Sequence, residues 1–346
     1  MSTSPRIFVT GVSGYVGGHT VTRMVEKHPE WTIAALVRNK EQSDIVQARW
    51  LEIETIIGDL DDKELMIKEG SKADVVLQTA SADHVSGVLA LIEGLSKREP
   101  TPGYLIHVGG TGMLNDVPNG FGQPSTKVYS DIADLQEITS LPVENHVHRD
   151  VDMAILEAQK KFSVPTAILS PPMIHGVGQG PLKKRSIQVP FLIEAVLKRG
   201  KGFQVLDGEN IWDQTHIDDV AAAFILLVEE ALKPNGGAAQ WGQDGYYFVA
   251  GAQFKWGDVS RAVSKIAFDQ GLIKSPDVDK LSVADASELH PWAPLIWGGN
   301  CRSRSDRIEK LGWRARRPLF QESLPAMIAE EATTLGTQSS KTTFDK

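Results

Sequence analysis

Residues 9–17 read Val-Thr-Gly-Val-Ser-Gly-Tyr-Val-Gly, and this stretch decides the fold. An apolar run of strand length, residues 6–10, leads into it, and an amphipathic helical pattern over residues 15–27 follows it. Gly11 stands where the strand ends, and glycine allows a tight turn there because it has no Cβ to oppose a positive φ. The stretch therefore predicts a strand, a tight turn and a helix in direct succession.

The three glycines of this turn also indicate a ligand. Gly14 leaves room for a pyrophosphate to approach the backbone, and Gly17 lets the helix pack closely against the sheet. The N–H groups of the first helical turn are free to bind phosphates, and the helix dipole adds to the attraction. A glycine triplet alone is weak evidence, but this one has the preceding strand and following helix that a dinucleotide-binding loop requires. The predicted contacts are Gly11, Ser13, Gly14, Tyr15, Val16 and Gly17.

Strand-length apolar runs and helical patterns alternate through the first half of the chain. The runs are residues 6–10, 32–37, 55–57, 75–79, 104–108 and 166–169. The helical patterns between most of them are residues 15–27, 62–68, 84–97 and 149–161. Strands and helices in alternation imply right-handed crossovers and a parallel sheet. The predicted fold class is therefore α/β, with a Rossmann-type doubly wound parallel sheet.

The later part of the chain predicts a second, smaller unit. Helices are expected at residues 189–199, 217–232 and 256–270, and strands at 203–206 and 246–249. We assign residues 1–175 to the Rossmann domain with a contribution from 203–232, residues 176–202 and 233–332 to a smaller C-terminal substrate lobe, and residues 333–346 to a flexible tail. Six of the eight tryptophans lie after position 200, where they either fill the core of this lobe or line a substrate cleft.

The end of the second predicted strand bears on the choice of cofactor. Residues 35–40 read Ala-Leu-Val-Arg-Asn-Lys. In dinucleotide-binding proteins an acidic residue near this point binds the ribose hydroxyls of NAD, whereas a basic residue suits the 2′-phosphate of NADP. No carboxylate occurs here before Glu41, and Arg38 can form a charge-assisted contact with a phosphate. A solvated surface arginine is the alternative. The sequence thus predicts NADP(H), with NAD(H) less favoured.

Two further segments at the carboxyl ends of predicted strands are expected to contact the cofactor. Asp59 is placed to accept a hydrogen bond from an adenine amino group, although capping of the next helix would also explain it. Residues 78–82 read Gln-Thr-Ala-Ser-Ala, and small residues there let a ribose lie against the backbone at the edge where α/β sheets bind ligands. The predicted contacts are Asp59, Leu60, Thr79, Ala80 and Ser81.

These features resemble the extended short-chain dehydrogenase/reductases, also called the NAD-dependent epimerase/dehydratase family. Residues 10–17, 58–60 and 169–176 resemble its cofactor loop, adenine motif and proline turn, the last with His-Gly where Tyr-Gly is commoner. Residues 208–221 and 305–313 resemble its later signatures, so the resemblance runs from about residue 6 to 330. It implies a cofactor-bound Rossmann core, a discontinuous substrate lobe, and a nicotinamide near Ala80, Ser81, Thr111 and Pro171.

The catalytic pattern of that family is incomplete in this chain. Its redox members usually carry Tyr-x-x-x-Lys, whose phenol passes a proton to or from a carbonyl or alcohol, and a Ser or Thr at the end of the fifth strand. Thr111 is the candidate for that hydroxyl, but no Tyr-x-x-x-Lys occurs in the sequence. If the helix at 149–161 is the usual one, His148 stands in the tyrosine position and Asp152 in the lysine position.

This substitution has two interpretations. In one, His148 is the proton donor or base and Asp152 orients it, because histidine suits proton transfer near neutral pH. In the other, His148 belongs to the helix start and redox chemistry has been lost. Our leading hypothesis is an NADP(H)-dependent oxidoreductase acting on a carbonyl or alcohol of a small organic molecule. The alternatives are a cofactor-retaining isomerase, epimerase or dehydratase, and a non-catalytic NmrA-like sensor.

Composition argues against several other classes of protein. The 346 residues are 41% hydrophobic and 23% charged, which is ordinary for a globular protein, and the net charge of −8 argues against nucleic acid as a partner. No apolar run is long enough to span a membrane, and the single cysteine, Cys301, favours the cytoplasm. His146 and His148 lack a convincing third ligand, so no metal site is predicted. The Lys-Lys-Arg at 183–185 is interpreted as a solvated charge run. A homodimer would be common in the family that the chain resembles.

Overall fold

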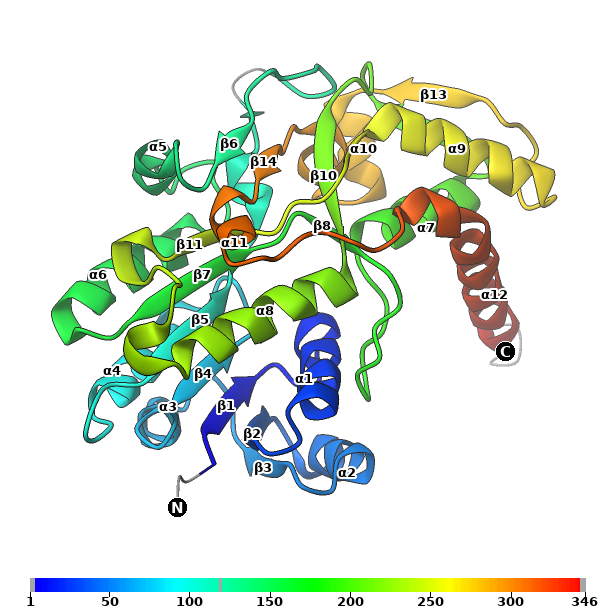
Figure 1. The fold of residues 1–346 in the computed structure, drawn as a ribbon. Helices are drawn as coiled ribbons and strands as arrows, with labels where there is room; N and C mark the ends of the chain where they lie inside the picture. Colours follow the sequence, from blue (N-terminus) through cyan, green and yellow to red (C-terminus); the bar gives the residue numbers. More distant parts are fainter. Residues whose placement is uncertain (1–3, 118–119, 343–346) are drawn as a thin grey trace.

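A sheet of seven parallel strands forms the centre of the protein (Figure 1). The computed structural model describes residues 4–117 and 120–342. The strand order is β11-β7-β5-β4-β1-β2-β3. The strands are β1 (Arg6–Thr10), β2 (Thr32–Val37), β3 (Glu54–Ile57), β4 (Val75–Gln78), β5 (Tyr104–Val108), β7 (Thr166–Ser170) and β11 (Tyr246–Phe248). This order has its switch point between β1 and β4, which confirms the predicted doubly wound Rossmann arrangement.

Helices cover both faces of this sheet, as strands that are apolar on both sides require. One face carries α1 (Tyr15–Lys27) and α8 (Ile217–Ala231), which pack against each other. Val46 of α2 (Lys40–Arg49) belongs to the same hydrophobic cluster. The other face carries three helices that share a second cluster: α3 (Lys63–Gly70), α4 (Val85–Ser96) and α6 (Arg149–Phe162).

The remaining elements build a smaller lobe at the carboxyl edge of the large sheet (Figure 1). Its strands are β8 (Met173–His175), β10 (Ile211–His216) and β12 (Gln253–Lys255) in one sheet, β9 (Gly202–Val205) and β13 (Val278–Leu281) in a second, and β6 (Tyr129–Ser130) and β14 (Ser303–Arg304) in a third. Its helices are α7 (Gln188–Arg199), α9 (Trp256–Asp269), α10 (Val283–Leu289), α11 (Asp306–Lys310) and α12 (Leu324–Thr342), and the short α5 (Leu135–Ser140) precedes α6.

The structure divides the chain between core and lobe differently from the sequence-based assignment. The strand β9 was expected to contribute to the Rossmann domain, but it pairs with β13 in the lobe. The strand β11 was expected in the lobe, but it pairs with β7 and forms the edge of the large sheet. Both are short apolar runs, and a run of three or four residues does not reveal which partner strand it will find. The helix α8 does pack on the core, as expected.

The tryptophans after residue 200 mainly fill cores. Trp212, Trp256, Trp297 and Trp313 are at most 5% exposed, whereas Trp292 is 53% exposed. The buried indoles pack edge-to-face with other rings, for example Trp256 with Trp212. Trp212, Trp256 and Trp297 therefore fit the lobe-core interpretation, whereas Trp313 is buried in the cluster that contains residues of α1 and α8.

The C-terminal segment is helical where composition predicted a flexible tail from residue 333. The helix α12 extends to Thr342, and residues 343–346 lie outside the described part of the chain. Packing of α12 against α7 and α9 through buried Leu324 and Ile328 explains why the helix forms despite its Thr and Ser content. Within the residues described, none of the helices combines the length and apolar character needed to cross a bilayer.

Candidate functional site

The turn between β1 and α1 is closed by glycines at positions where no side chain fits. Gly11 has a φ of +88°, and a Cβ there would come within 2.5 Å of the Ala80 amide nitrogen. A Cβ on Gly17 would lie 2.3 Å from both the Gly11 carbonyl oxygen and the Thr79 hydroxyl. Gly14 differs, because its Cβ would meet only the Gly11 carbonyl oxygen, at 3.1 Å. Gly11 and Gly17 therefore shape the turn, while Gly14 keeps its outer surface open.

The first turn of α1 offers its N–H groups to an anion. Gly14 is the N-cap, no side chain caps the helix, and no acidic residue occurs in its first turn. Ser13, Tyr15 and Val16 are half-buried around this helix start, and the Tyr15 hydroxyl donates to the Gly176 carbonyl oxygen at 2.6 Å. A pyrophosphate fits this arrangement, since uncapped N–H groups and the helix dipole both favour negative charge.

Arg38 lies exposed immediately after β2, beside the edge where the glycine turn lies. Its backbone N–H donates to Gln42 Oε1 at 3.1 Å, and Asn39 caps α2 by accepting from the Gln42 amide at 2.9 Å. Among residues 4–117 and 120–342 the Arg38 guanidinium forms no ion pair. A cation without a protein partner at this position suits the phosphate contact that the sequence predicts.

Asp59 and Leu60 lie in the turn between β3 and α3. Asp59 Oδ1 accepts from the backbone N–H groups of Asp61 and Asp62, at 2.9 and 3.2 Å. Asp62, rather than Asp59, is the N-cap of α3. Leu60 is half-buried against the first turn of α4. The Asp59 side chain is exposed, so its carboxylate stabilises the turn and is also accessible to solvent.

The segment after β4 approaches the glycine turn closely. The Thr79 hydroxyl donates to the Thr10 carbonyl oxygen at 2.7 Å, which ties the ends of β4 and β1 together. Ala80 is exposed and Ser81 is half-buried, so this stretch borders the open side of the turn. Pro171, at the end of β7, is buried, and its carbonyl oxygen accepts from the Thr111 amide at 3.0 Å. The predicted cofactor contacts on these strands thus gather at one edge of the sheet.

A histidine and a carboxylate are paired at the same edge. Nδ1 of His148 lies 2.5 Å from Oδ1 of Asp83, although the two residues are 65 positions apart. Asp83 follows β4 and His148 is the N-cap of α6. Because Nδ1–H donates to the carboxylate, Nε2 is left to exchange a proton. The hydrogen bond from His148 holds the pKa of the Asp83 carboxyl below its ordinary value.

The free nitrogen of His148 faces the turn that follows β5. A Cβ on Gly110 would lie 3.1 Å from Nε2, and one on Gly112 would lie 3.9 Å from it. His148 has a φ of 70°, in the left-handed region, and such strained backbone is concentrated at functional sites. The ring is thus held at the carboxyl edge of the parallel sheet, where proteins of this architecture bind ligands.

The carboxylate that contacts this ring is Asp83, whereas the sequence had predicted Asp152 in that position. Asp152 lies in the first turn of α6 and its carboxylate is fully buried, where its Oδ2 accepts from the Tyr246 hydroxyl at 2.8 Å. The same oxygen lies 3.4 Å from Nη1 of Arg149, which is also fully buried. Burial raises the pKa of Asp152. Spacing by four residues predicts a shared helix face, but His148 precedes the helix and its left-handed backbone directs the ring elsewhere.

Thr111 is placed inside the protein. It is completely buried at the start of a 3-10 turn (Thr111–Leu114), and the Cys301 thiol donates to its hydroxyl and its carbonyl oxygen, both at 2.9 Å. Cys301 belongs to the lobe, so this contact joins the lobe to the end of β5. The structure does not bring the Thr111 hydroxyl to the surface that His148 borders.

His107 lies on β5 behind the paired residues. It is fully buried, and its register partner on β4 is Gln78. Burial, together with the nearby His148, lowers the pKa of His107 to about 3, so the ring is neutral at physiological pH. Because the buried His107 ring carries no charge, the charged partner of His148 is the Asp83 carboxylate. The other nearby histidine, His146, contacts the Met113 carbonyl oxygen through Nδ1 at 2.6 Å.

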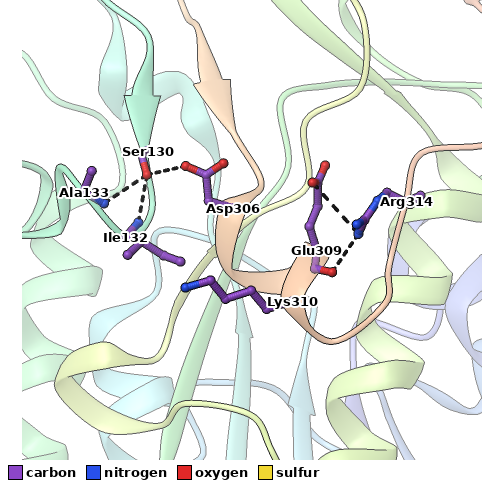
Figure 2. Close-up of a pocket in the computed structure, with 7 residues that line it drawn as sticks. All are labelled: Ser130, Ile132, Ala133, Asp306, Glu309, Lys310 and Arg314. Atoms are coloured by element: carbon purple, nitrogen blue, oxygen red, sulfur yellow. Dashed lines mark hydrogen bonds and ion pairs between the residues drawn. The ribbon is translucent and has the colours of Figure 1, made fainter.

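A separate surface pocket lies between the end of β6 and α11 (Figure 2). Its volume is about 430 Å³, and its charged groups largely satisfy one another. Ser130 donates to Asp306 at 2.6 Å, and Arg314 donates to the Glu309 carbonyl oxygen at 2.6 Å (Figure 2). No residue predicted to bind the cofactor lines this pocket, which therefore does not compete with the sheet edge as the candidate site.

Asp83 is the functional candidate that the sequence did not single out. A signal was present, because Asp83 follows the small residues at the end of β4 and the carboxyl ends of neighbouring parallel strands meet at one edge. The partner could not be inferred in the same way. His148 reaches that edge through a loop before α6 whose path depends on tertiary contacts.

Comparisons with known proteins identify relatives of this chain and structures of similar fold. The sequence model of the NAD dependent epimerase/dehydratase family matches residues 7–96. Oxidase ucsJ from an Acremonium species is 33% identical over 349 residues, which covers 96% of this chain and 99% of that protein. The structure of dTDP-glucose 4,6-dehydratase from Bacillus anthracis in complex with NAD has a TM-score of 0.66 at 16% identity, covering 94% of this chain and 96% of that one.

A second solved structure has a similar overall arrangement. The UDP-glucose 4-epimerase of Thermotoga maritima with UDP-glucose has a TM-score of 0.64 at 17% identity, and the match covers 95% of this chain and 99% of that one. At such identities the two structures establish the fold alone, and the oxidase relative carries the evidence of kinship over the full length.

Proposed function

Because this chain belongs to the NAD-dependent epimerase/dehydratase family, we propose that it is an NADP(H)-dependent oxidoreductase acting on a carbonyl or alcohol of a small organic molecule. The observation that carries the proposal is the Asp83–His148 pair, which lies at the same sheet edge as the glycine turn. An acid–base group beside a dinucleotide cradle is the combination that this chemistry needs. A cytoplasmic location is part of the proposal, since the only cysteine is unpaired.

The residues around the turn fit the cofactor in distinct ways. The first-turn N–H groups of α1, beside Gly14, would hold the diphosphate, and Arg38 would hold the 2′-phosphate. Ala80 and Ser81 would border the ribose on the nicotinamide side. When bound, the nicotinamide supplies or accepts a hydride. The protein's contribution is to orient the two reactants and to control a proton.

His148 is the group proposed to control that proton. Its Nδ1–H is held by Asp83, which fixes the tautomer and the direction of the ring. In reduction, Nε2–H of the imidazolium would protonate the substrate oxygen, and in oxidation neutral Nε2 would accept the alcohol proton. This assigns to His148 the proton transfer that the tyrosine performs in the family pattern.

Turnover with a panel of ketones and aldehydes, followed by nicotinamide absorbance, tests the proposal. Loss of NADPH absorbance with formation of the alcohol supports it. Product formed without a net absorbance change would instead identify an isomerase or dehydratase that regenerates its cofactor. Tight cofactor binding with no product from any substrate would favour a sensor and contradict the proposal.

Changing Gly14 to valine is expected to weaken dinucleotide binding about ten- to a hundredfold, the range for losing one or more charge-assisted hydrogen bonds. Gly14 has a φ of −83°, which valine tolerates, and its Cβ would meet only the Gly11 carbonyl oxygen at 3.1 Å, so the thermal midpoint should fall less than in Gly17→Val. Calorimetric titration and a melting curve measure both quantities. Gly17→Val is the contrasting variant, because its side chain collides with the turn itself and should lower the melting point as well. If the Gly14 variant bound the dinucleotide as tightly as wild type, the diphosphate would not bind at this loop.

Changing Arg38 to alanine is expected to reduce the affinity for NADPH about tenfold or more and to leave the affinity for NADH nearly unchanged. The reason is that a single charge-assisted hydrogen bond to phosphate is worth about 1.5–3 kcal/mol. Titration of both nucleotides against wild type and variant gives the ratio. Lys40→Ala is a suitable control, since Lys40 is a neighbouring cation already paired with Asp44. An equal loss for both nucleotides would contradict the assigned role.

A further inference from the structure

The segment that connects β8 to α7 lies along α1. Residues 176–184, here termed the strap, run beside the first two turns of that helix (Figure 1). The backbone N–H of Gln179 donates to His19 Nδ1 at 3.1 Å, and its carbonyl oxygen accepts from the Thr22 hydroxyl at 3.2 Å. Together with the Tyr15–Gly176 hydrogen bond, these contacts fix the strap to the helix that begins at the proposed diphosphate site.

Two glycines let the strap and the helix touch. A Cβ on Gly180 would lie 2.8 Å from the Gly18 Cα, and a Cβ on Gly18 would lie 3.1 Å from the Gly180 Cα. Both glycines are buried, and so is His19 between them and α8. The strap is therefore packed against α1, and the positions of its later residues are set by this contact.

The end of the strap lies beside the glycine turn. The backbone N–H of Lys183 donates to the carbonyl oxygen of Ser13 at 3.4 Å, and Ser13 stands between Gly11 and Gly14. Lys184 accepts from the Gly178 amide at 2.8 Å, and a Cβ on Gly178 would lie 2.9 Å from the Tyr15 ring. Both lysines are thus anchored by their backbones next to the turn, and both side chains are exposed.

The three cationic residues at 183–185 differ in their ion pairs. Arg185 pairs with Glu331 and Glu194, which ties it to α12 and α7. Within the described ranges 4–117 and 120–342, neither Lys183 nor Lys184 forms an ion pair. Burial, and then the charge of Asp218 on α8, raise the pKa of the Tyr15 phenol. Asp218 already has cationic partners in Arg23 and Arg317 and a hydrogen bond to His19. Of the three cations at 183–185, two therefore have no ion-pair partner among the residues that the structure describes.

We propose that Lys183 and Lys184 bind the diphosphate of the dinucleotide and complete the cradle from the strap side. The proposal rests on the proposed function, because it takes the dinucleotide site as given. A lysine ammonium on its flexible stem is suited to an exposed, strongly anionic group such as a diphosphate. The N–H groups of α1 approach the diphosphate from the helix, and the lysines would neutralise its outward-facing oxygens.

Fragments of the cofactor separate this role from other effects. ADP-ribose contains the diphosphate, whereas adenosine 2′-monophosphate contains only the phosphate assigned to Arg38. For the double variant Lys183→Ala/Lys184→Ala we expect ADP-ribose affinity to fall about tenfold, as for loss of a charge-assisted hydrogen bond, with adenosine 2′-monophosphate affinity unchanged within about twofold. The Arg38→Ala variant should show the reverse pattern. Lys274→Ala, an exposed lysine after α9 with no ion pair among the described residues, is the matched control.

Calorimetry on the full chain gives each dissociation constant without any need for turnover. A double variant with arginine at both positions should keep ADP-ribose affinity near that of wild type, and a glutamine pair replaces the alanine pair if the latter melts at a lower temperature. Wild-type affinity for ADP-ribose in the alanine and glutamine variants would overturn the inference, as would an equal loss for both fragments. If wild type bound neither fragment nor NADP(H), the proposed function itself would fail.

Discussion

Changing His148 to alanine is expected to lower kcat about a hundred- to ten-thousandfold, the range for loss of a positioned acid–base group, with the dissociation constant of NADP(H) kept within about twofold. The ring contacts Asp83 and the turn after β5, whereas the diphosphate is assigned to the N-terminus of α1. Stopped-flow measurement of the hydride step and a separate binding titration check the two parts of this expectation.

A second measurement shows whether the effect of His148→Ala comes from loss of the Asp83–His148 hydrogen bond. The hydrogen bond from His148 holds the pKa of the Asp83 carboxyl below its ordinary value, so removing the ring should raise that pKa. Carboxyl chemical shifts followed through a pH titration detect the change. His146→Ala is the matched control, because the Nδ1 atom of this neighbouring histidine contacts the Met113 carbonyl oxygen and not Asp83. A kcat near that of wild type in His148→Ala would exclude His148 as the proton-transfer group.

Changing Asp152 to alanine is expected to lower the free energy of unfolding by about 3–5 kcal/mol, because it leaves the buried Arg149 without a counter-charge. Both side chains are fully buried, and the other hydrogen bonds of the Arg149 guanidinium within the described part of the chain go to the carbonyl oxygens of Thr139 and Leu141. The Tyr246 hydroxyl would also lose its carboxylate acceptor, which leaves it the weaker acceptor Sδ of Met113 at 2.8 Å. Urea unfolding of wild type and variant gives the difference.

The controls for this prediction use a surface pair and a double replacement. Lys265 and Asp269 form an exposed pair on α9, and Asp269→Ala should cost less than about 0.5 kcal/mol. Replacing Arg149 and Asp152 together with methionine and leucine should recover much of the loss, since it removes both buried charges. A loss below about 1 kcal/mol for Asp152→Ala would show that the pair is solvated in solution.

The N-terminal elements were predictable because local pattern and tertiary role agree there. The bounds of β1, α1, β2 and β5 equal those expected from the sequence. The helix α2 was not predicted, since it is mostly polar and its buried residues are Ser43 and Val46, too few to give a helical apolar pattern. The strand β10 was missed for a related reason. It carries Asp213 and Gln214 into the interior, where hydrogen bonds to Ser303 and Phe320 make their burial tolerable.

The residues of the candidate site also fall into two groups, those predictable from local sequence and those placed by tertiary contacts. The glycine turn and Arg38 follow directly from a strand, a turn and a helix that are contiguous in sequence. The Asp83–His148 pair depends on two loops brought together by the sheet, and the spacing rule that pointed to Asp152 holds only inside a helix. His148 adopts left-handed backbone at the N-cap, so its ring leaves the face that the rule assumes.

The contact between Cys301 and Thr111 makes the lone thiol a natural reporter of internal motion. Burial raises the pKa of this thiol, so in the closed protein it is both shielded and protonated, and alkylating reagents should modify it very slowly. Modification would then require the C-terminal lobe to separate from the end of β5. The rate of Cys301 alkylation would therefore report how often the lobe separates from the end of β5. A ligand that contacts both the lobe and the sheet should lower that rate.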